Sequence, residues 1–566
     1  MSERILVAVA WPYANGSLHL GQIAGAYLPA DIFARYHRIK GNEVFMVSGS
    51  DQHGTPVTIK AEQDGVTPGE LTAACHRDFL ESWRRLGISF DLFTTTGTEN
   101  HAKVTQDIFL KLLEGGYIYK ATVSQPYCPQ CRRYLPDRYI EGTCPFCGST
   151  AARGDQCDDC GKPMNPGEMV DPRCRLCGGT PKFQDSEHFF FKLSDFQGQL
   201  NDWVKKQSKK ANWRANVTNL TKRYLKEGLR DRAITRDIGW GVAVPVKGFE
   251  EKRIYVWFEA VIGYLSASKE WAKSSGDGEG WRPFWEDDKA KSYYFIGKDN
   301  IPFHTLIWPA MLMGYGGLNL PHDVPANEFL TIEGRKLSTS RNWAVWVPDY
   351  LSRYEPDPLR YLLSINMPEN GDTDFSWREF LRRNNDELVA TYGNLAHRVL
   401  TFTYRNFEGS VPTCDDMGIS SIGERTPTQL EIDSFAKFND VDSLLSKCHF
   451  KQALTLAMSV AHQANRYLDE ESPWKVIKEN RVTAAKSLYA ALCSISHLRT
   501  MLYPFLPFSS QKLHEYLGFE GRVEDYGWKT TEPEPGQKLL EPKPLFTKLD
   551  DKLIEEETAR LGQTNC

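Results

Sequence analysis

The sequence predicts an α/β protein whose Rossmann-like, doubly wound domain is split by a metal-binding insertion and followed by an α-helical bundle. Three observations support this prediction: a strand–turn–helix–strand pattern near the start, a dense group of cysteines, and helical periodicity throughout the last third. A chain of 566 residues has room for about three to five domains. A single small binding module is therefore excluded.

The composition narrows the class of protein further. The chain is 41% hydrophobic and 12% aromatic, which is enough for several ordinary cores. Lys and Arg number 68 against 73 Asp and Glu, and the net charge of −5 argues against a protein held on nucleic acid by bulk charge. The first residues lack a secretory signal, and no window approaches the ~20 apolar residues of a membrane helix. We expect a cytoplasmic protein that does not bind membranes.

The first strand, helix and strand follow one another within fifty residues. Residues 5–10 form a continuous apolar run that predicts a buried strand, residues 18–40 predict a helix that ends at Gly41, and residues 43–48 predict a second strand. Ligands of doubly wound domains bind beyond the carboxyl ends of the strands. Polar residues stand at two such ends, 17–22 and 50–54.

The later elements are predicted from changes in composition and periodicity along the chain. Residues 117–185 are rich in Cys, Pro, Gly and Arg with little periodicity, which is typical of a metal-organised insertion. Strand-like runs at 253–258 and 292–297, with a helical run at 303–313, indicate that the α/β domain then resumes. Beyond Phe375 the apolar residues recur at helical spacing, which predicts the bundle.

Eight of the 13 cysteines form four Cys-x-x-Cys pairs, and three of these pairs are followed directly by glycine. Each such turn presents two thiolates to one centre, so eight thiolates make two tetrahedral zinc sites of a structural kind. Disulfides, a redox pair or iron are the alternatives, and without a secretory signal we favour zinc. The four pairs are divided between the two ions in one of two ways. In the nested arrangement the inner four cysteines bind one ion and the outer four bind the other, and in the sequential arrangement neighbouring pairs along the chain bind the same ion. The pairs are Cys128 and Cys131, Cys144 and Cys147, Cys157 and Cys160, and Cys174 and Cys177.

Two further segments have the character of a nucleotide site. His19 and Gly21 open the first helix, where free backbone N–H groups and the helix dipole favour phosphate, and glycine permits close approach. Residues 336–340, Lys-Leu-Ser-Thr-Ser, form a basic, hydroxyl-rich loop flanked by Arg335 and Arg341. Taken alone, that loop is most often a solvated turn.

Together the two segments resemble the HIGH and KMSKS signatures of class I aminoacyl-tRNA synthetases. Five local strings, at residues 10–16, 51–56, 185–191, 255–260 and 295–299, are similar to those of the methionyl-tRNA synthetase family, and the resemblance extends over about residues 5–550. Two positions depart from the signatures. Gln22 stands in place of histidine and keeps a hydrogen-bond donor, and Thr339 stands where a second lysine is frequent, which leaves Lys336 as the phosphate-binding cation.

The resemblance implies that the protein joins L-methionine to ATP, releases pyrophosphate and then transfers the methionyl group to the terminal adenosine of tRNA(Met). It implies Mg²⁺ with the ATP, and positioning and charge stabilisation rather than a covalent nucleophile. The implied catalytic residues are His19, Gly21, Gln22 and Lys336, and the implied ATP-binding residues are Tyr13, His19, Gly21, Asp299, Lys336 and Thr339. The implied methionine-binding residues are Asp51 for the ammonium group, with Trp11, Tyr13, Trp257, Ala260, Tyr264 and His304 around the side chain.

Two segments are candidates for contact with tRNA. Residues 203–236 hold eleven Lys and Arg against Glu227 and Asp231, a patch that suits a phosphate backbone or equally a solvated helix face. By resemblance, Asn394, Arg398 and Trp474 read the anticodon. An aromatic ring with Asn and Arg side chains is suited to single-stranded bases.

The resemblance also gives expected boundaries for six parts of the chain, which we expect to be a monomer. They are 1–116 and 236–325 for the two halves of the Rossmann catalytic domain, 117–235 for the connective insertion with two zinc knuckles, 326–375 for the KMSKS-loop and stem-contact region, 376–528 for the anticodon-binding bundle and 529–566 for the tail.

The alternative functions are those of another class I synthetase, a catalytically silent tRNA-binding homologue, and a small nucleotidylyltransferase. Intact His19, Asp51 and Lys336 argue against the silent homologue.

Overall fold

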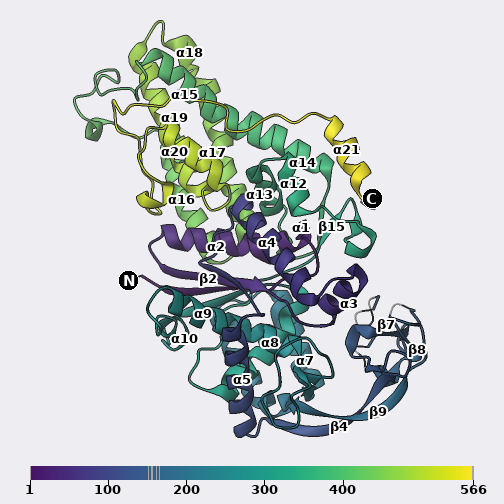
Figure 1. Cartoon of the computed structure of the whole chain (residues 1–566). Helices are drawn as coiled ribbons and strands as arrows, with labels where there is room; N and C mark the ends of the chain where they lie inside the picture. Colours follow the sequence, from purple (N-terminus) through teal and green to yellow (C-terminus); the bar gives the residue numbers. More distant parts are fainter. Residues whose placement is uncertain are drawn as a thin grey trace.

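A five-stranded parallel sheet lies at the centre of the molecule (Figure 1). The structure, a computed structural model, describes residues 2–150, 152–154, 157, 159–160, 162, 164 and 166–563. The sheet has the order β14-β13-β1-β2-β3, and all four pairings are parallel. Its strands are β1 (Arg4–Val9), β2 (Glu43–Ser50), β3 (Leu92–Thr95), β13 (Lys291–Gly297) and β14 (Ala326–Asn327).

The two faces of this sheet belong to two different cores. Ile5 and Val7 of β1 pack into the core that continues into the helical bundle, whereas Leu6 and Ala8 pack into the core beneath the opposite face. Successive side chains of a strand point to opposite faces, so a strand buried on both faces must be apolar throughout. Burial on both faces therefore explains why the first strand is a continuous apolar run.

The predicted helix over 18–40 is present as one rod made of three consecutive pieces. They are α1 (Leu20–Gln22), a π-helical turn η1 (Ile23–Tyr27) and α2 (Leu28–Ile39). Gly41 adopts a φ of +84° just beyond the rod, a conformation that favours glycine. The predicted helix and its stop are confirmed.

The second half of the domain resumes after the insertion as expected, with one correction. Strand β13 leads into a π-helical turn η7 (Phe303–Ile307) and α11 (Trp308–Tyr315). The predicted strand over 253–258 is wrong, because only β12 (Arg253–Ile254) is extended and α8 (Val256–Glu259) is helical. A short apolar run does not distinguish a strand from a buried helix, and here the N–H of Glu259 bonds to the carbonyl of Tyr255 in a helical turn.

The insertion is more regular than its composition suggested. β4 (Ile118–Cys128) and β9 (Lys182–Phe191) form a long antiparallel ribbon with ten paired positions. The ribbon carries the cysteine-rich tip and a small sheet in which β6 (Ile140–Thr143) lies between β7 (Ala152–Arg153) and β8 (Val170–Cys174) (Figure 1). Two helices, α6 (Gln197–Lys210) and α7 (Ala215–Glu227), lead back to the sheet domain. The expectation of little periodicity therefore fails for the ribbon arms.

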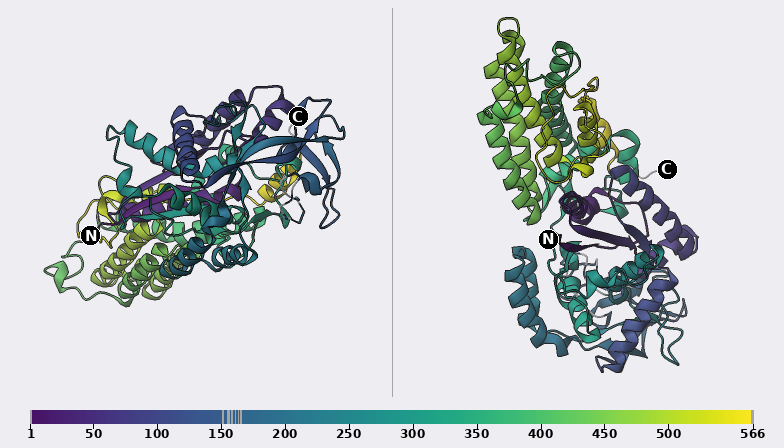
Figure 2. Two further views of the ribbon diagram at one scale, coloured as in Figure 1. Left: turned by 90° about the horizontal axis from the view of Figure 1, so that it is seen from below. Right: turned by 90° about the vertical axis from the view of Figure 1, so that its left-hand side faces the viewer.

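The last third of the chain is helical, as the spacing predicted. The right-hand view of Figure 2 shows the bundle on one side of the sheet and the helices of the other core on the opposite side. Among the described residues no helix is long and apolar enough to cross a membrane. The main helices are α14 (Trp377–Arg382), η9 (Arg383–Gly393), α15 (Asn394–Asn406), α16 (Gln429–Ser446), α17 (Phe450–Glu471), α18 (Pro473–Val476), α19 (Arg481–Leu502) and α20 (Pro507–Tyr516).

The tail leaves the bundle and returns to the sheet domain, where it ends in α21 (Lys552–Arg560) (Figure 1). Glu557 of this helix is buried and accepts hydrogen bonds from Arg353 at 2.7 and 2.8 Å and from the hydroxyl of Tyr354 at 2.9 Å. The N–H of Gly562 donates to the carbonyl of Asn342 at 3.0 Å. The tail is therefore bonded to the segment that follows the lysine-containing loop.

Candidate functional site

The first signature lies at the start of the helical rod, as the sequence predicted. His19 is extended, with φ −123° and ψ 163°, and its N–H donates to Oε1 of Gln22 at 3.0 Å. Gln22 thus closes the first turn by accepting a hydrogen bond with its side-chain oxygen. The sequence had indicated only a donor role for this residue.

The second signature lies directly beside the first. The N–H of Leu20 donates to the carbonyl of Val345 at 3.1 Å, and the N–H of Val347 donates to the carbonyl of Leu18 at 2.8 Å. A Cβ atom added at Gly21 would lie 3.2 Å from Cδ1 of Leu337. There is therefore little room for a larger side chain where the lysine-containing loop packs against the helix start.

The lysine-containing loop is a hairpin with an exposed tip. β15 (Leu330–Ile332) pairs with β16 (Arg335–Lys336) and with β17 (Thr373–Phe375). Ser338 and Trp343 exchange two backbone hydrogen bonds of 3.0 and 2.9 Å, which close the loop, and Lys336 is exposed. Thr339 begins a short 3-10 turn. The cation is thus held on a short, closed loop with its side chain toward solvent.

Burial shifts the pKa values of His19 and Asp299 in opposite directions. Burial lowers the pKa of His19 to about 4, so the imidazole is neutral at pH 7. Its Nδ1 has no hydrogen-bond partner among the described residues. Asp299 follows strand β13, and burial raises the pKa of its carboxyl, while the charges of Lys298 and Lys336 oppose that rise. Lys336 and Asp299 therefore lie within electrostatic reach of each other.

Asp51 and Tyr13 lie next to each other at the carboxyl edge of the sheet. The N–H of Ala14 donates to the carbonyl of Asp51 at 2.8 Å, and the N–H of Asp51 donates to the carbonyl of Pro12 at 2.8 Å. The Asp51 side chain is buried, and this burial together with the nearby Glu259 raises its pKa well above the usual range. A cationic ligand group at this carboxylate would compensate the buried charge.

Aromatic side chains surround the region next to Asp51. The ring of Tyr13 lies edge-on to Trp257 at 6.2 Å, and Trp257 stacks on Phe303 at 4.4 Å. The hydroxyl of Tyr264 lies 2.8 Å from Nε2 of His304, whose pKa burial lowers to about 4. Ala260 begins the 3-10 turn that directly follows α8 (Ala260–Ile262), and it is partly exposed.

Trp11 occupies a slot that only glycines permit. A Cβ atom at Gly49 would lie 2.3 Å from Cζ3 of Trp11, and a Cβ atom at Gly263 would lie 2.7 Å from Cε2 of the same ring. The ring lies 6.5 Å from Tyr264, and its Nε1 is buried with no partner among the described residues. Trp11 therefore belongs to the same aromatic wall as Tyr264 and His304.

Sequence reasoning missed one group of buried ionisable residues and one ring. His53 donates to Glu259 across 2.7 Å, and Nε2 of His101 lies 4.0 Å from the other carboxylate oxygen of Glu259. Phe303, which stacks on Trp257, was also missed. His53 and Glu259 are both inside the similar strings, at 51–56 and 255–260, but nothing in the sequence pairs them.

The eight cysteines form two clusters in the nested arrangement. In the outer cluster the sulfur atoms of Cys128 and Cys177 lie 3.5 Å apart and those of Cys131 and Cys174 lie 3.8 Å apart. In the inner cluster the matching distances are 3.9 Å between Cys144 and Cys160 and 3.7 Å between Cys147 and Cys157. A tetrahedron with Zn–S bonds of about 2.3 Å has edges of about 3.8 Å, whereas a disulfide is about 2.05 Å long. Both clusters fit a four-thiolate metal site.

The three residues expected at the anticodon end also lie together. Asn394 and Arg398 are one helical turn apart on α15, and the guanidinium of Arg398 lies 4.3 Å from the ring centre of Trp474 on α18. Asn394 is exposed, and the other two are partly exposed. Trp474 also packs against the bundle core.

The basic segment at 203–236 divides into two kinds of residue. Nine of its eleven cations are exposed, on α6, on α7 and in the segment that follows α7. The other two are partly buried: Arg214 donates to Asn327 at 2.5 Å and to the carbonyl of Cys448 at 2.9 Å, and Arg236 lies 3.7 Å over the ring of Tyr255. Arg214 and Arg236 are therefore structural.

Comparisons with known proteins agree with this geometry. A family model described as "tRNA synthetases class I (M)" matches residues 5–400, and one described as "Anticodon binding domain of methionyl tRNA ligase" matches residues 420–565. A methionine–tRNA ligase of Dehalococcoides mccartyi (strain ATCC BAA-2266 / KCTC 15142 / 195) is 60% identical over 564 residues, covering 99% of this chain and 100% of the relative. Another, from Thermomicrobium roseum, is 50% identical and covers 99% of both chains.

A solved structure has the same fold. The Mycobacterium tuberculosis methionyl-tRNA synthetase in complex with methionyl-adenylate superimposes with a TM-score of 0.78 at 23% identity, covering 96% of this chain and 100% of that one. The split sheet domain and the helical bundle are thus shared along the whole length. The chain belongs to the class I methionyl-tRNA synthetases, the family of methionine–tRNA ligases.

Proposed function

We propose that the protein activates L-methionine with ATP, forming methionyl-adenylate and pyrophosphate, and then transfers the methionyl group to the terminal adenosine of tRNA(Met). The observation that carries this proposal is the contact between the two signatures, Gly21 against Leu337, at the carboxyl edge of the sheet where Asp51 also lies. A site for phosphates and a buried carboxylate for an ammonium group thus share one edge.

The proposed chemistry is positioning and charge stabilisation. The carboxylate of methionine attacks the α-phosphorus of Mg²⁺·ATP in line, and the bond to pyrophosphate breaks. The neutral imidazole of His19 donates to the phosphate oxygens, and the exposed Lys336 neutralises the leaving pyrophosphate. Gly21 admits the nucleotide, Gln22 holds the turn, Tyr13 and Thr339 line the ATP site, and Asp299 binds the ribose.

The proposed methionine pocket pairs one carboxylate with an aromatic wall. Asp51 binds the ammonium group, and Trp11, Tyr13, Trp257, Ala260, Tyr264 and His304 enclose the thioether side chain. A thioether is apolar and polarisable, so aromatic rings suit it better than charged groups. The hydrogen bond between Tyr264 and His304 holds both side chains in one orientation.

We assign Zn²⁺ to the two cysteine clusters, and tRNA to two surfaces: the exposed cations of residues 203–236 and the helical bundle. Four thiolates leave no open coordination position, so zinc would organise the tip of the insertion without taking part in the reaction. The nine exposed cations of residues 203–236 would bind the phosphate backbone. Asn394, Arg398 and Trp474 would contact anticodon bases by hydrogen bonding and stacking.

The test is amino-acid-dependent exchange of labelled pyrophosphate into ATP, run with each of the twenty amino acids. Methionine is expected to give the fastest exchange. Preference for another amino acid would support a different class I synthetase. The absence of exchange with all twenty, together with retained binding of tRNA(Met), would support a silent homologue.

A further inference from the structure

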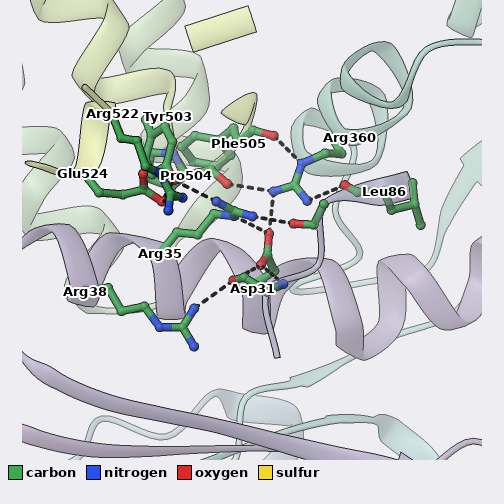
Figure 3. A network of polar contacts seen from close by, with 12 residues as sticks. Asp31, Arg35, Arg38, Leu86, Arg360, Tyr503, Pro504, Phe505, Arg522 and Glu524 are labelled. Carbon is green, nitrogen blue, oxygen red and sulfur yellow. Dashed lines mark hydrogen bonds and ion pairs between the residues drawn. The ribbon is translucent and has the colours of Figure 1, made fainter. Parts of the chain in front are cut away.

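A buried network of charged side chains joins the sheet domain to the helical bundle (Figure 3). At its centre is Asp31 of α2, which is fully buried and lies outside both signatures. One of its oxygens accepts from Nε of Arg35 at 3.0 Å and from Nη2 of Arg360 at 2.7 Å. The other accepts from the backbone N–H of Ser89 at 2.8 Å and from the Ser89 hydroxyl at 2.6 Å. Every acceptor site of the carboxylate is thus occupied.

Arg360 of α13 (Pro356–Ile365) connects three parts of the chain. Its other donors bind the carbonyls of Leu86 at 3.1 Å, Pro504 at 2.9 Å and Phe505 at 2.8 Å. Leu86 ends helix α4 (Pro68–Leu86) of the sheet domain, and Pro504 and Phe505 lie between α19 and α20 of the bundle. A single buried guanidinium therefore holds the two domains to each other.

Arg35, one helical turn after Asp31 on α2, also bonds to both the sheet domain and the bundle. It donates to the carbonyl of Gly87 and, at 2.8 Å, to the hydroxyl of Tyr503 at the end of α19. The Tyr503 hydroxyl in turn donates to Glu524, which pairs with Arg522 at 2.8 Å (Figure 3). Although burial opposes ionisation, the two arginines hold the pKa of Asp31 at about 2, so the centre of the network is charged at neutral pH.

Helix α2 connects this network to the candidate active site. It continues from α1 and η1 as a rod of 20 residues, about 30 Å long, that begins immediately after His19. Near its far end Tyr36 donates to the side chain of Asp442 of α16 at 2.7 Å, and Lys40 pairs with the same carboxylate at 2.8 Å. One rod thus has His19 at its start and the bundle bound to its middle and its end.

We propose that Asp31, acting through Arg360, is a positioning residue that sets the bundle in one orientation relative to the helix beginning at His19. Apolar contacts alone permit small slides, whereas forked guanidinium donors fix direction as well as distance. A tRNA held at its anticodon by the bundle would then present its 3′ end at the adenylate in a single geometry. This inference rests on the function proposed above.

The test compares Asp31→Asn with the wild-type enzyme in three reactions: methionine-dependent pyrophosphate exchange, charging of full-length tRNA(Met), and charging of a minihelix that contains only the acceptor stem. The minihelix does not reach the bundle, so its charging does not depend on domain orientation. We expect kcat/KM for full-length tRNA to fall by about tenfold to a hundredfold, because a displacement of about 1 Å at the reacting atoms costs that much. Exchange and minihelix charging stay near wild type.

Arg38→Gln is the matched control. Arg38 lies on the same helix and donates to Ser89, a partner of Asp31, at 2.8 Å and to Asp91 at 2.7 Å. Both partners lie within the sheet domain, so neither of these bonds reaches the bundle. It should leave all three reactions near wild type. Arg360→Lys, which keeps the charge but loses the fork, should repeat the selective loss, and it replaces Asp31→Asn if that variant does not fold.

Two results would overturn the inference. Equal losses in all three reactions would mean that Asp31 serves only overall stability, and unchanged charging of full-length tRNA would mean that the orientation does not depend on it. Failure of the wild-type enzyme to exchange or to charge would instead refute the proposed function.

Discussion

Nδ1 of His53 lies 2.7 Å from Oε1 of Glu259, and both side chains are buried next to Asp51. The backbone N–H of His53 also donates to the Asp51 carboxylate at 3.2 Å. The second oxygen of Glu259 has no hydrogen-bond partner among the described residues. The pair thus lies against the carboxylate that we assign to the methionine ammonium group, and His53 bonds to both acids.

Removing Glu259 should destabilise the protein and, because His53 would no longer be held against the Asp51 carboxylate, weaken methionine binding. Glu259→Gln leaves a buried imidazole without its counter-charge, and we expect a loss of about 3 kcal/mol in the free energy of unfolding, measured with urea. Burial by itself lowers the pKa of His53, but Glu259 raises it above the usual value. The pair's contribution is therefore complete below pH ~6.5 and declines as the pH rises through the folded-state pKa.

The surface pair of Lys60 and Asp64, at 2.7 Å, provides the control. Asp64→Asn should cost less than about 1 kcal/mol, because exposed ion pairs contribute little. A Glu259→Gln variant as stable as Asp64→Asn would contradict the assignment. The KM for methionine in the exchange reaction is the second measurement, and it should rise only for Glu259→Gln.

Acid should destabilise the folded protein between pH 6.5 and about 4. Burial lowers the pKa of His37 and His101 to about 3, and that of His304 and His497 to about 4. The unfolded chain therefore binds more protons in this range, and each such histidine costs about 1.4 kcal/mol per pH unit well below 6.5. Urea unfolding at pH 7, 6 and 5 measures the slope. His497 lies in the bundle away from the site, and His497→Gln should reduce the slope of the unfolding free energy against pH. An unchanged slope would show that His497 is protonated in the folded state.

Gly263 and Trp11 should behave as a compensating pair. Gly263→Ala places a Cβ atom 2.7 Å from the indole ring, and we expect it to cost about 1–3 kcal/mol in stability and to raise the KM for methionine. Adding Trp11→Leu should recover most of the lost stability. Gly198, which is helical and has no atom near its added Cβ, is the control, and Gly198→Ala should be neutral or stabilising. A double variant no more stable than Gly263→Ala would place the clash elsewhere.

Zinc content should report the nested arrangement of the cysteines. The wild-type protein is expected to hold about two zinc ions per chain. Replacing the inner four cysteines by serine should leave about one ion, because the outer four still form a complete site. Sequential sharing would leave none, since each site would then have lost two ligands. Cys414→Ser, which lies outside both clusters, should keep both ions.

Trp474 should separate tRNA charging from amino-acid activation. Trp474→Ala removes a stacking surface and the partner of Arg398, and we expect charging to fall by about tenfold to a hundredfold, since base–aromatic stacking contributes about 1–3 kcal/mol. Pyrophosphate exchange should stay near wild type, and Trp474→Phe should restore most of the charging. Equal loss of exchange and charging would make Trp474 a packing residue of the bundle.

The sequence by itself determined those features that depend on neighbours along the chain. The apolar run of β1, the glycine that ends α2 and the four Cys-x-x-Cys turns are local, so their spacing was sufficient to predict a strand, a helix and metal ligands. Local spacing failed at residues 253–258, because a run of four to six apolar residues fits a strand and a buried helix equally well.

Only the tertiary structure decided which distant residues meet. The nested sharing of the cysteines follows from the antiparallel ribbon of β4 and β9, which brings the first and last pairs together. The pairing of His53 with Glu259, and of Asp31 with Arg360, joins residues 206 and 329 positions apart. The sequence carries the chemical type of each partner, but a hydrogen bond or an ion pair depends on separations of about 3 Å that only the packing of the cores sets.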